Sequence, residues 1–406
     1  MNGMRKKEKC NLRRMHFFFH CFIIANPFPN SKIKYWIDGI KTTIIENKRL
    51  LGNRKEIGTL DYSAYILEET KKVLAIDSPT GYTKEAATYV FEQYKMLGYE
   101  PIFTKKGGVL VCLNGSLQEK EPQRDGILVE AHLDTLGAMV AEVMANGRLR
   151  ITPLGGLNAN NAEAENCRII TREGKKYDGT FQMKNASVHV NGEYSSTSRS
   201  FDVMEVVIDE LVSSKEEVEA LGIMTGDIVC FDPRTVITES GYIKSRFLDD
   251  KLSVGILLGY AKYFKDNQVE ADRKIYHHIT VFEEVGHGGS ASVPEDVSEI
   301  LSVDMGCVGE GLACREHQVS ICAKDSGGPY HYDVVTNLIA CAKREKLDFA
   351  VDVYPYYGSD AEAGLRAGYD VKHGLIGSGV YASHGYERSH KKGVENTFAL
   401  LRAYLG

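Results

Sequence analysis

The spacing of apolar residues changes along the chain, and it predicts helices in some segments and short strands in others. Apolar residues recur with a helical period at 60–75, and a second helix is predicted from Thr83, a typical N-cap residue, to Gly98. Strand-like apolar runs follow at 108–113 and 126–131. Because helices alternate with apolar strands, this part of the chain is typical of an α/β layer fold.

A different pattern appears between about residues 143 and 243, where the helical period is largely lost. Short β-like pieces separated by turn residues replace it, and a capping box at 214–217 predicts one short helix. The β-like pieces lie at 148–152, 167–171, 180–183 and 227–231. Structureless loops of this length are rare in compact domains, so we predict that 143–243 is an inserted, small β-barrel-like domain.

The alternation of helices and strands returns after the insertion and continues to the end of the chain. Predicted helices lie at 250–264 and 332–345, with a last helix near the C-terminus. Predicted strands lie at 275–282, 300–303, 319–323, 349–354 and 371–376. The fold class that we predict is α/β, with a mixed, largely parallel sheet flanked by helices, built from 58–142 and 244–406.

Composition narrows the class of protein. The chain has 406 residues, of which 43% are hydrophobic and 26% are charged, as in an ordinary globular protein of two or three domains. A net charge of −6 argues against a nucleic-acid partner, which requires a basic surface. Nine cysteines without a Cys-x-x-Cys pair indicate free thiols, so we expect a cytoplasmic location.

Residues 1–57 differ from the rest and are interpreted as an atypical N-terminal extension. A basic start and an apolar run at 16–24 superficially resemble a signal peptide. The run is short, contains two histidines and has no convincing cleavage site. It is also too short to span a bilayer, so we predict no membrane partner.

Five residues of metal-ligand type lie where predicted strands end. They are His132, Asp249, Glu284, Asp304 and His384. Each alone has an ordinary explanation; Asp249, for example, precedes a predicted helix and could be only its N-cap. Together at one edge of a sheet, they are predicted to form a dinuclear metal site, since imidazole and carboxylate ligands suit Zn, and also Co or Mn. One carboxylate must then bridge two metals about 3.5–4 Å apart.

Further acids complete the predicted chemistry. Glu283 precedes Glu284 after an apolar strand, where successive side chains diverge, so we predict that it is the general base. A solvated acidic pair is the less favoured alternative. Asp134, two residues after His132, is predicted to accept a hydrogen bond from that imidazole. Asp250 is predicted to stabilise the start of the following helix.

The order of these motifs resembles the M42 family of metallo-aminopeptidases, whose fold is that of co-catalytic zinc peptidases. The matching segments are His132-Leu-Asp134, Leu248-Asp249-Asp250-Lys251, Glu283-Glu284-Val285-Gly286, Val303-Asp304 and Gly358-Ser359-Asp360-Ala361. The resemblance extends from about residue 60 to the C-terminus. It implies that Asp249 bridges the metals. It also implies that His132 and Asp304 bind one metal, and that Glu284 and His384 bind the other.

The resemblance also implies a homo-oligomer. Members of the family assemble through the inserted domain, often as dodecamers whose active sites face an interior cavity. We therefore expect a dimer-based assembly, of which a dodecamer is one form.

The sequence departs from the usual family pattern in three places. Thr135 stands where an acid is common, His287-Gly288 replaces a Leu-Arg-like pair, and 383–390 replaces a Tyr-x-His-Ser/Thr-Pro segment. The last variant resembles the M42 subgroup associated with the N-acetylglutaminylglutamine amide osmoprotectant system. It leaves two candidates for the last ligand: His384 is our prediction and His390 is the alternative.

The function that we predict is that of a dinuclear metal-dependent aminopeptidase, which hydrolyses N-terminal residues from short peptides. A metal-bridging hydroxide would attack the scissile carbonyl, with Glu283 as the general base. The alternative is a related co-catalytic metal amidase or deacylase that acts on a modified dipeptide, and the variant at 383–390 keeps it open. A non-catalytic scaffold is disfavoured because none of the expected ligands is missing.

Overall fold

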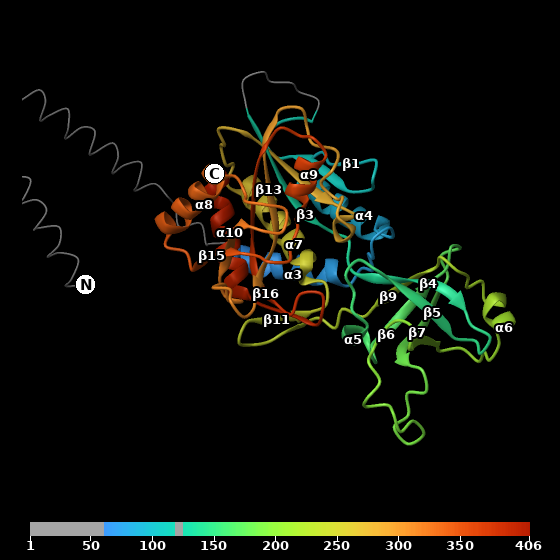
Figure 1. Cartoon of the computed structure of the whole chain (residues 1–406). Helices are drawn as coiled ribbons and strands as arrows, with labels where there is room; N and C mark the ends of the chain where they lie inside the picture. Colours follow the sequence, from blue (N-terminus) through green and yellow to red (C-terminus); the bar gives the residue numbers. More distant parts are fainter. Residues whose placement is uncertain (1–60, 118–124) are drawn as a thin grey trace, which may run out of the picture. The chain divides into compact units, whose positions relative to one another are not determined.

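One large mixed sheet and one closed barrel make up the computed structural model, which describes residues 61–117 and 125–406 (Figure 1). The predicted extension at 1–57 lies outside the described residues. No helix within these two described ranges is long and apolar enough to cross a membrane.

The large sheet has parallel strands at its centre and antiparallel strands towards its edges. Within the described ranges it contains eleven strands. In spatial order, nine of them are β1 (Ile102–Phe103), β2 (Val109–Cys112), β12 (Lys274–Thr280), β3 (Gly126–His132), β13 (Val297–Val308), β16 (Lys372–Tyr381), β17 (Glu387–His390), β11 (Tyr242–Ser245) and β10 (Val236–Ile237). The other two are β14 (Val319–Lys324), which pairs with β16, and β15 (Phe349–Val353), which pairs with β14. Strands β12, β3, β13 and β16 run parallel to one another, so the predicted mixed sheet is confirmed.

Among the described residues, five helices pack on one face of the sheet, and a shorter helix packs on the other. Strand residues alternate accordingly: Ile127 and Val129 lie in the core shared with the five helices, whereas Leu128 packs with Ala361 of the short helix. The five are α3 (Tyr62–Leu74), α4 (Lys84–Met96), α7 (Leu248–Asp266), α8 (Tyr332–Glu345) and α10 (Lys391–Leu405). The short helix is α9 (Asp360–Arg366).

Helix α7 is buried along most of its length and lies directly against α3. Two glycines make this contact possible. A Cβ on Gly255 would lie 2.1 Å from Oγ1 of Thr70, and one on Gly259 would lie 2.2 Å from Ile66. Only residues without a side chain allow the helices to approach this closely. This packing fixes the position of Asp249 in the first turn of α7.

The inserted domain is a closed antiparallel barrel, as the sequence predicts. In order around the barrel, its strands within the described ranges are β4 (Gly137–Val143), β5 (Leu149–Leu154), β8 (Met204–Ile208), β7 (Lys176–Met183), β6 (Asn166–Ile170) and β9 (Ile228–Phe231). Two short helices, α5 (Ala159–Ala162) and α6 (Lys215–Ala220), lie between its strands in the sequence. Ser214 caps α6 by accepting a hydrogen bond from the Glu217 amide, as the capping box predicts. The barrel's first strand begins at Gly137, upstream of the predicted boundary at residue 143.

Two strands of the sheet are longer than predicted, and this changes where the candidate ligands lie. Strand β13 continues beyond Asp304 to Val308, and β16 continues to Tyr381. The sequence pattern was broken by polar residues and glycines, but a glycine is required here: a Cβ on Gly377 would lie 2.0 Å from the Asp304 carbonyl oxygen. Asp304 therefore lies inside a strand rather than at its end. Strand β17 was not predicted.

Candidate metal centre

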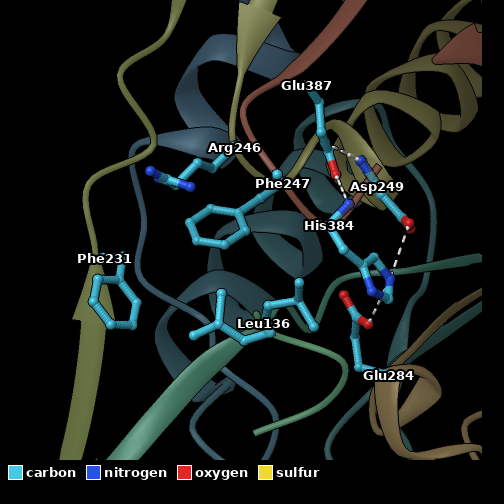
Figure 2. A pocket seen from close by; sticks show the side chains of 10 residues that line it. Leu136, Phe231, Arg246, Phe247, Asp249, Glu284, His384 and Glu387 are labelled. Carbon is cyan, nitrogen blue, oxygen red and sulfur yellow. Dashed lines mark hydrogen bonds and ion pairs between the residues drawn. The ribbon is translucent and has the colours of Figure 1, made fainter. Parts of the chain in front are cut away.

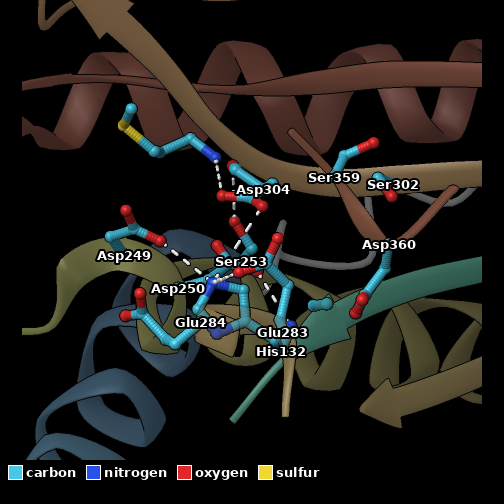
Figure 3. Close-up of polar contacts among 12 residues, drawn as sticks. His132, Asp249, Asp250, Ser253, Glu283, Glu284, Ser302, Asp304, Ser359 and Asp360 are labelled. Atoms are coloured by element: carbon cyan, nitrogen blue, oxygen red, sulfur yellow. Dashed lines mark hydrogen bonds and ion pairs between the residues drawn. The ribbon is translucent and has the colours of Figure 1, made fainter. Parts of the chain in front are cut away.

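Three of the predicted ligands meet at the carboxyl end of β3. His132 ends this strand, Asp249 belongs to the first turn of α7, and Asp304 lies on the neighbouring strand β13 (Figure 3). His132 Nε2 is 3.0 Å from Asp249 Oδ1 and 4.0 Å from Asp304 Oδ2. One donor atom from each of the three lies within 4.8 Å of the other two. All three side chains are buried.

The other two predicted ligands, His384 and Glu284, lie next to each other on the side of the second Asp249 oxygen. His384 follows β16, and its Nε2 is 3.6 Å from Asp249 Oδ2 and 3.5 Å from Glu284 Oε2 (Figure 2). Ser383 also donates a hydrogen bond to Asp249 Oδ2, at 3.1 Å. The two carboxylate oxygens of Asp249 therefore face two different histidines.

The orientation of His132 is fixed by main-chain atoms, which differs from our prediction. Its Nδ1 is 2.9 Å from the Asp134 carbonyl oxygen but 3.8 Å from the Asp134 carboxylate. A carbonyl can only accept, so Nδ1 carries the hydrogen and Nε2 can offer its lone pair to a metal. The Asp134 carboxylate instead accepts hydrogen bonds from the Thr80 hydroxyl and from the backbone amides of Glu283 and Glu284, at 2.7, 3.1 and 3.4 Å.

The two adjacent glutamates lie on a single 3-10 turn, η1 (Glu283–Val285), and not on an extended strand as predicted. Phe282 enters the turn in the left-handed region, with φ of 72°. The side chains still diverge: Glu283 Oε2 lies 3.7 Å from His132 Nε2, whereas Glu284 faces His384.

The segment around Asp249 does not have the geometry of an ordinary helix cap. Asp249 (φ −76°, ψ 100°) and Asp250 (φ −124°, ψ 24°) are non-helical, and the peptide bond between them is cis. The Asp249 carboxylate contacts His132 and Ser383. Asp250 stands where the regular helix begins, as predicted, but its carboxylate also accepts a hydrogen bond from the backbone amide of His132, at 3.1 Å.

Glu387 is a residue of this site that the sequence interpretation missed. Its carboxylate accepts one hydrogen bond from the backbone amide of Asp249 and another from that of His384, each at 3.0 Å (Figure 2). Glu387 thus connects the two segments that bring these residues together. In the sequence, Glu387 could be noticed only as a glutamate three residues after His384. Nothing in the hydrophobic pattern indicated that it is buried.

The alternative ligand, His390, lies elsewhere. It occupies the N-cap of α10, where its Nδ1 accepts a hydrogen bond from the Lys392 amide. Its Nε2 is 3.0 Å from the Ser240 carbonyl oxygen, and its ring contacts Tyr242 edge-on. The structure therefore brings His384, and not His390, to Asp249.

The carboxylates of the cluster carry more negative charge than its histidines can balance. Burial, with the charge of Asp249, raises the pKa of Asp304 to about 7 and that of Glu284 well above its ordinary value. Burial also raises the pKa of Glu283. Burial opposes protonation of His132, but its hydrogen bond to Asp249 and the charge of Glu283 raise its pKa well above the usual range. Carboxylates shift in this way when they lack a counter-charge, which bound divalent cations would supply.

The donor set fits two divalent cations. One group consists of His132, Asp304 and Oδ1 of Asp249, and the other of His384, Glu284 and Oδ2 of Asp249. Each group offers one imidazole and two carboxylates, which are ligands that Zn, Co and Mn accept.

A small pocket lies beside the His384 side of the cluster (Figure 2). Its apolar lining comes from the barrel and the α/β domain, and consists of Leu136, Leu157, Phe231 and Phe247. Arg246 also lines it, but its guanidinium donates to Glu165 at 2.8 Å, so the charge is paired. The pocket therefore adjoins His384, the more exposed histidine of the cluster.

The family model and the known relatives that this chain resembles all point to the same protein family. A family model described as M42 glutamyl aminopeptidase matches residues 107–400. The Bacillus subtilis protein YhfE, a candidate aminopeptidase, is 43% identical over 339 residues, which cover 84% of this chain and 96% of that protein. The glutamyl aminopeptidase of Lactococcus lactis is 25% identical over 264 residues, 62% of this chain and 72% of that protein.

Solved structures show the same fold at lower identity. An aminopeptidase from Desulfurococcus kamchatkensis superposes with a TM-score of 0.74 at 22% identity, covering 85% of this chain and 95% of that chain. The TET1 peptidase of Pyrococcus horikoshii, described as assembling into a tetrahedron or a large octahedral shell, gives 0.72 at 22% identity, over 83% of this chain and 98% of that one.

Proposed function

The chain belongs to the M42 glutamyl aminopeptidase family of peptidases, and we propose that it is a dinuclear metal-dependent aminopeptidase acting on short peptides. The observation that carries the proposal is the position of Asp249. Its two oxygens face two histidines from distant parts of the chain, at 3.0 Å for His132 and 3.6 Å for His384. A single-metal site would not need this arrangement, whereas a pair of metals requires a bridging carboxylate.

In this proposal, His132 and Asp304 hold one cation, His384 and Glu284 hold the other, and Asp249 bridges them. When bound, such cations polarise a scissile carbonyl and acidify a water molecule. Zn is the metal that we expect, with Co or Mn as substitutes, because the ligands are imidazoles and carboxylates.

The proposed general base is Glu283. Its carboxylate lies on the same side of the cluster as His132, at 3.7 Å, and its neighbour Glu284 points to the other side. Glu283 would take a proton from the attacking water and then deliver it to the leaving amine, so no net proton is consumed by the side chain. Asp134 supports this role because it accepts hydrogen bonds from the backbone amides of both glutamates.

The test combines metal analysis with matched substrates. We expect about two divalent cations per purified chain. We also expect hydrolysis of short peptides with a free N-terminus, and none of the same peptides with an acetylated N-terminus. Hydrolysis of the blocked substrates alone would overturn the aminopeptidase proposal in favour of the amidase or deacylase. Protein that binds cations but cleaves neither substrate would contradict both.

We also propose that the protein is a cytoplasmic homo-oligomer. The assembly is suggested by the TET1 peptidase. The loops that follow β7 and β8 in the inserted domain also expose apolar side chains that a partner copy could cover, among them Val188, Val190 and Leu211. The location is suggested by the cysteines of the described ranges, of which Cys167, Cys230, Cys307, Cys314, Cys322 and Cys341 are free thiols. Sedimentation of the purified chain tests the first point, because a monomer at micromolar concentration would contradict it.

A further inference from the structure

Asp360 contacts both ends of the segment that carries the two adjacent glutamates. One of its carboxylate oxygens accepts a hydrogen bond from the Thr280 hydroxyl, at the last residue of β12. The other accepts a hydrogen bond from the backbone amide of Gly289, at 2.7 Å. The segment between these two points contains η1, and therefore Glu283 and Glu284. Figure 3 shows Asp360 set apart from the proposed ligands, and its hydrogen bonds go to the two ends of this segment.

The segment approaches Asp360 so closely that side chains are excluded from two consecutive positions. A Cβ on Gly288 would lie 2.4 Å from Asp360 Oδ1, and one on Gly289 would lie 2.3 Å from the Asp360 carbonyl oxygen. Heavy atoms that are not bonded do not approach to such distances, so both positions need glycine. Gly288 and Gly289 are therefore both required for the close approach of this segment to Asp360.

Two other side chains hold the same segment at separate points. Asp134 accepts hydrogen bonds from the backbone amides of Glu283 and Glu284 in its middle. Lys106, from the turn between β1 and β2, donates to the carbonyl oxygens of His287 and Gly288. Unlike these two, Asp360 contacts the segment at its beginning and at its end, so it sets the distance that the turn must span.

Stabilisation of the start of α9 would be the ordinary role of Asp360, but it explains fewer of these contacts than a role in holding the glutamate segment. The residue lies in the first turn of α9, where a negative charge is favourable. That role does not require both carboxylate oxygens to contact a different part of the chain. It also gives no reason for the two glycines.

We propose that Asp360 is a positioning residue, which sets the placement of Glu283 and Glu284 by holding Thr280 and Gly289. The proposal rests on the proposed function, because it concerns the roles assigned there to the two glutamates. Asp360 touches neither substrate nor cation in this account.

The test replaces Asp360 and compares the result with a matched control. Asp352 is also a buried aspartate that accepts two hydrogen bonds, from the backbone amides of Ala313 and Cys314 at 2.7 and 2.9 Å, but it contacts nothing in the glutamate segment. In metal-free full-length protein, we expect Asp360→Ala to speed amide hydrogen exchange at 281–289 by at least about tenfold, and Asp352→Ala to leave it unchanged. Asp360→Asn should restore most of the protection, since its amide oxygen can still accept from Gly289.

Metal binding and kinetics supply the second measurement. Asp360→Ala should weaken binding of one of the two cations by about 10- to 100-fold, because the placement of Glu284 changes. It should lower kcat while KM stays nearly constant, because the placement of Glu283 changes. If Asp360→Ala fails to fold, Thr280→Val removes one of the two contacts with little change of shape, and Thr280→Ser restores the hydroxyl.

The outcomes separate this proposal from the proposed function. Unchanged exchange at 281–289 in Asp360→Ala and Thr280→Val would overturn the positioning role whether or not the protein is an aminopeptidase. Faster exchange with unchanged metal affinity and kcat would overturn it as well. Faster exchange with weaker binding of one cation would support it even if the substrate proves to be other than a peptide.

Discussion

The two halves of the candidate centre are built in different ways. On the first side, His132 and Asp304 lie on β3 and β13, which are hydrogen-bonded neighbours in the parallel part of the sheet. Their relative side-chain exposures are 2% and 7%. On the second side, His384 lies in a loop after β16 with φ of 63°, and its side chain is 40% exposed. Its partner Glu284 lies on a 3-10 turn.

This difference indicates how each half is kept in place. Ligands on paired strands are positioned by the sheet's own hydrogen bonds, whereas ligands on loops need dedicated side chains. The second half has such side chains: Glu387 holds the backbone at His384, and Asp134 holds the backbone at Glu284. We therefore expect the His384 half to bind its cation more weakly and to be the side that substrate reaches, because the pocket opens there.

The largest effect is expected from Asp249→Asn, which changes the residue common to both halves. An amide has one oxygen, so it cannot offer a donor to both sides. We expect both cations to be lost and activity to fall to background, as measured by metal analysis after gel filtration. Asp250→Asn is the matched control, because this neighbour contacts the His132 backbone instead of facing both histidines, and it should retain both cations.

Glu283→Gln should separate chemistry from metal binding. The amide keeps the shape of the side chain but cannot take a proton, so we expect kcat to fall by about 10²- to 10⁴-fold with both cations retained. Steady-state kinetics on a metal-loaded sample provides the measurement. Full activity with full metal content would contradict the assignment of the base.

Replacing one histidine at a time should expose the difference between the halves. We expect His384→Ala to bind one cation, with the affinity of the stronger wild-type site, in calorimetric titration of metal into the apo-protein. His132→Ala should leave only the weaker site. His390→Ala is the control and should bind both cations as the wild type does, since this residue caps α10. Two sites of equal affinity in the wild type would contradict the comparison.

The smallest effect is expected from Glu387→Gln. The amide can accept from only one of the two backbone N–H groups that Glu387 now serves, at Asp249 and His384. We expect the affinity of the weaker site to fall by about 10- to 100-fold, as for other residues that orient metal ligands. Equal weakening of both sites would show that Glu387 acts on the bridge alone. Glu299→Gln, at a buried glutamate that contacts Arg273 and Tyr404 instead, is the control.

The two halves also differ in how far the sequence could predict them. The segments that become β3 and β12 are rich in apolar and β-forming residues and contain no internal glycine or proline, so their strands, and the polar residues that follow, could be placed from the pattern alone. The helix predicted at 332–345 matches α8, whose buried residues Val334, Leu338, Cys341 and Ala342 recur with a helical spacing. Asp304 was found as a candidate ligand but was placed at a strand end, because a polar residue next to a glycine interrupts the hydrophobic pattern even where the strand continues.

The loop-built half depends on contacts that local patterns do not encode. The 3-10 turn at Glu283 lies in a segment whose backbone amides donate to Asp134 and Asp360, residues far away in the chain. His384 and His390 are separated by β17, a four-residue strand whose burial alternates although all four of its residues are polar, so the sequence shows no hydrophobic alternation there. Glu387 is buried because of the elements that pack around that strand, and the sequence of the strand does not indicate this.

The central claim is that Asp249 bridges two cations, one held with His132 and the other with His384. A crystal structure of the metal-loaded protein, with anomalous diffraction recorded at the absorption edge of the bound metal, tests it most directly. The account predicts two anomalous peaks about 3.5–4 Å apart, one on each side of the Asp249 carboxylate. A single peak, or two peaks that do not share Asp249, would contradict it.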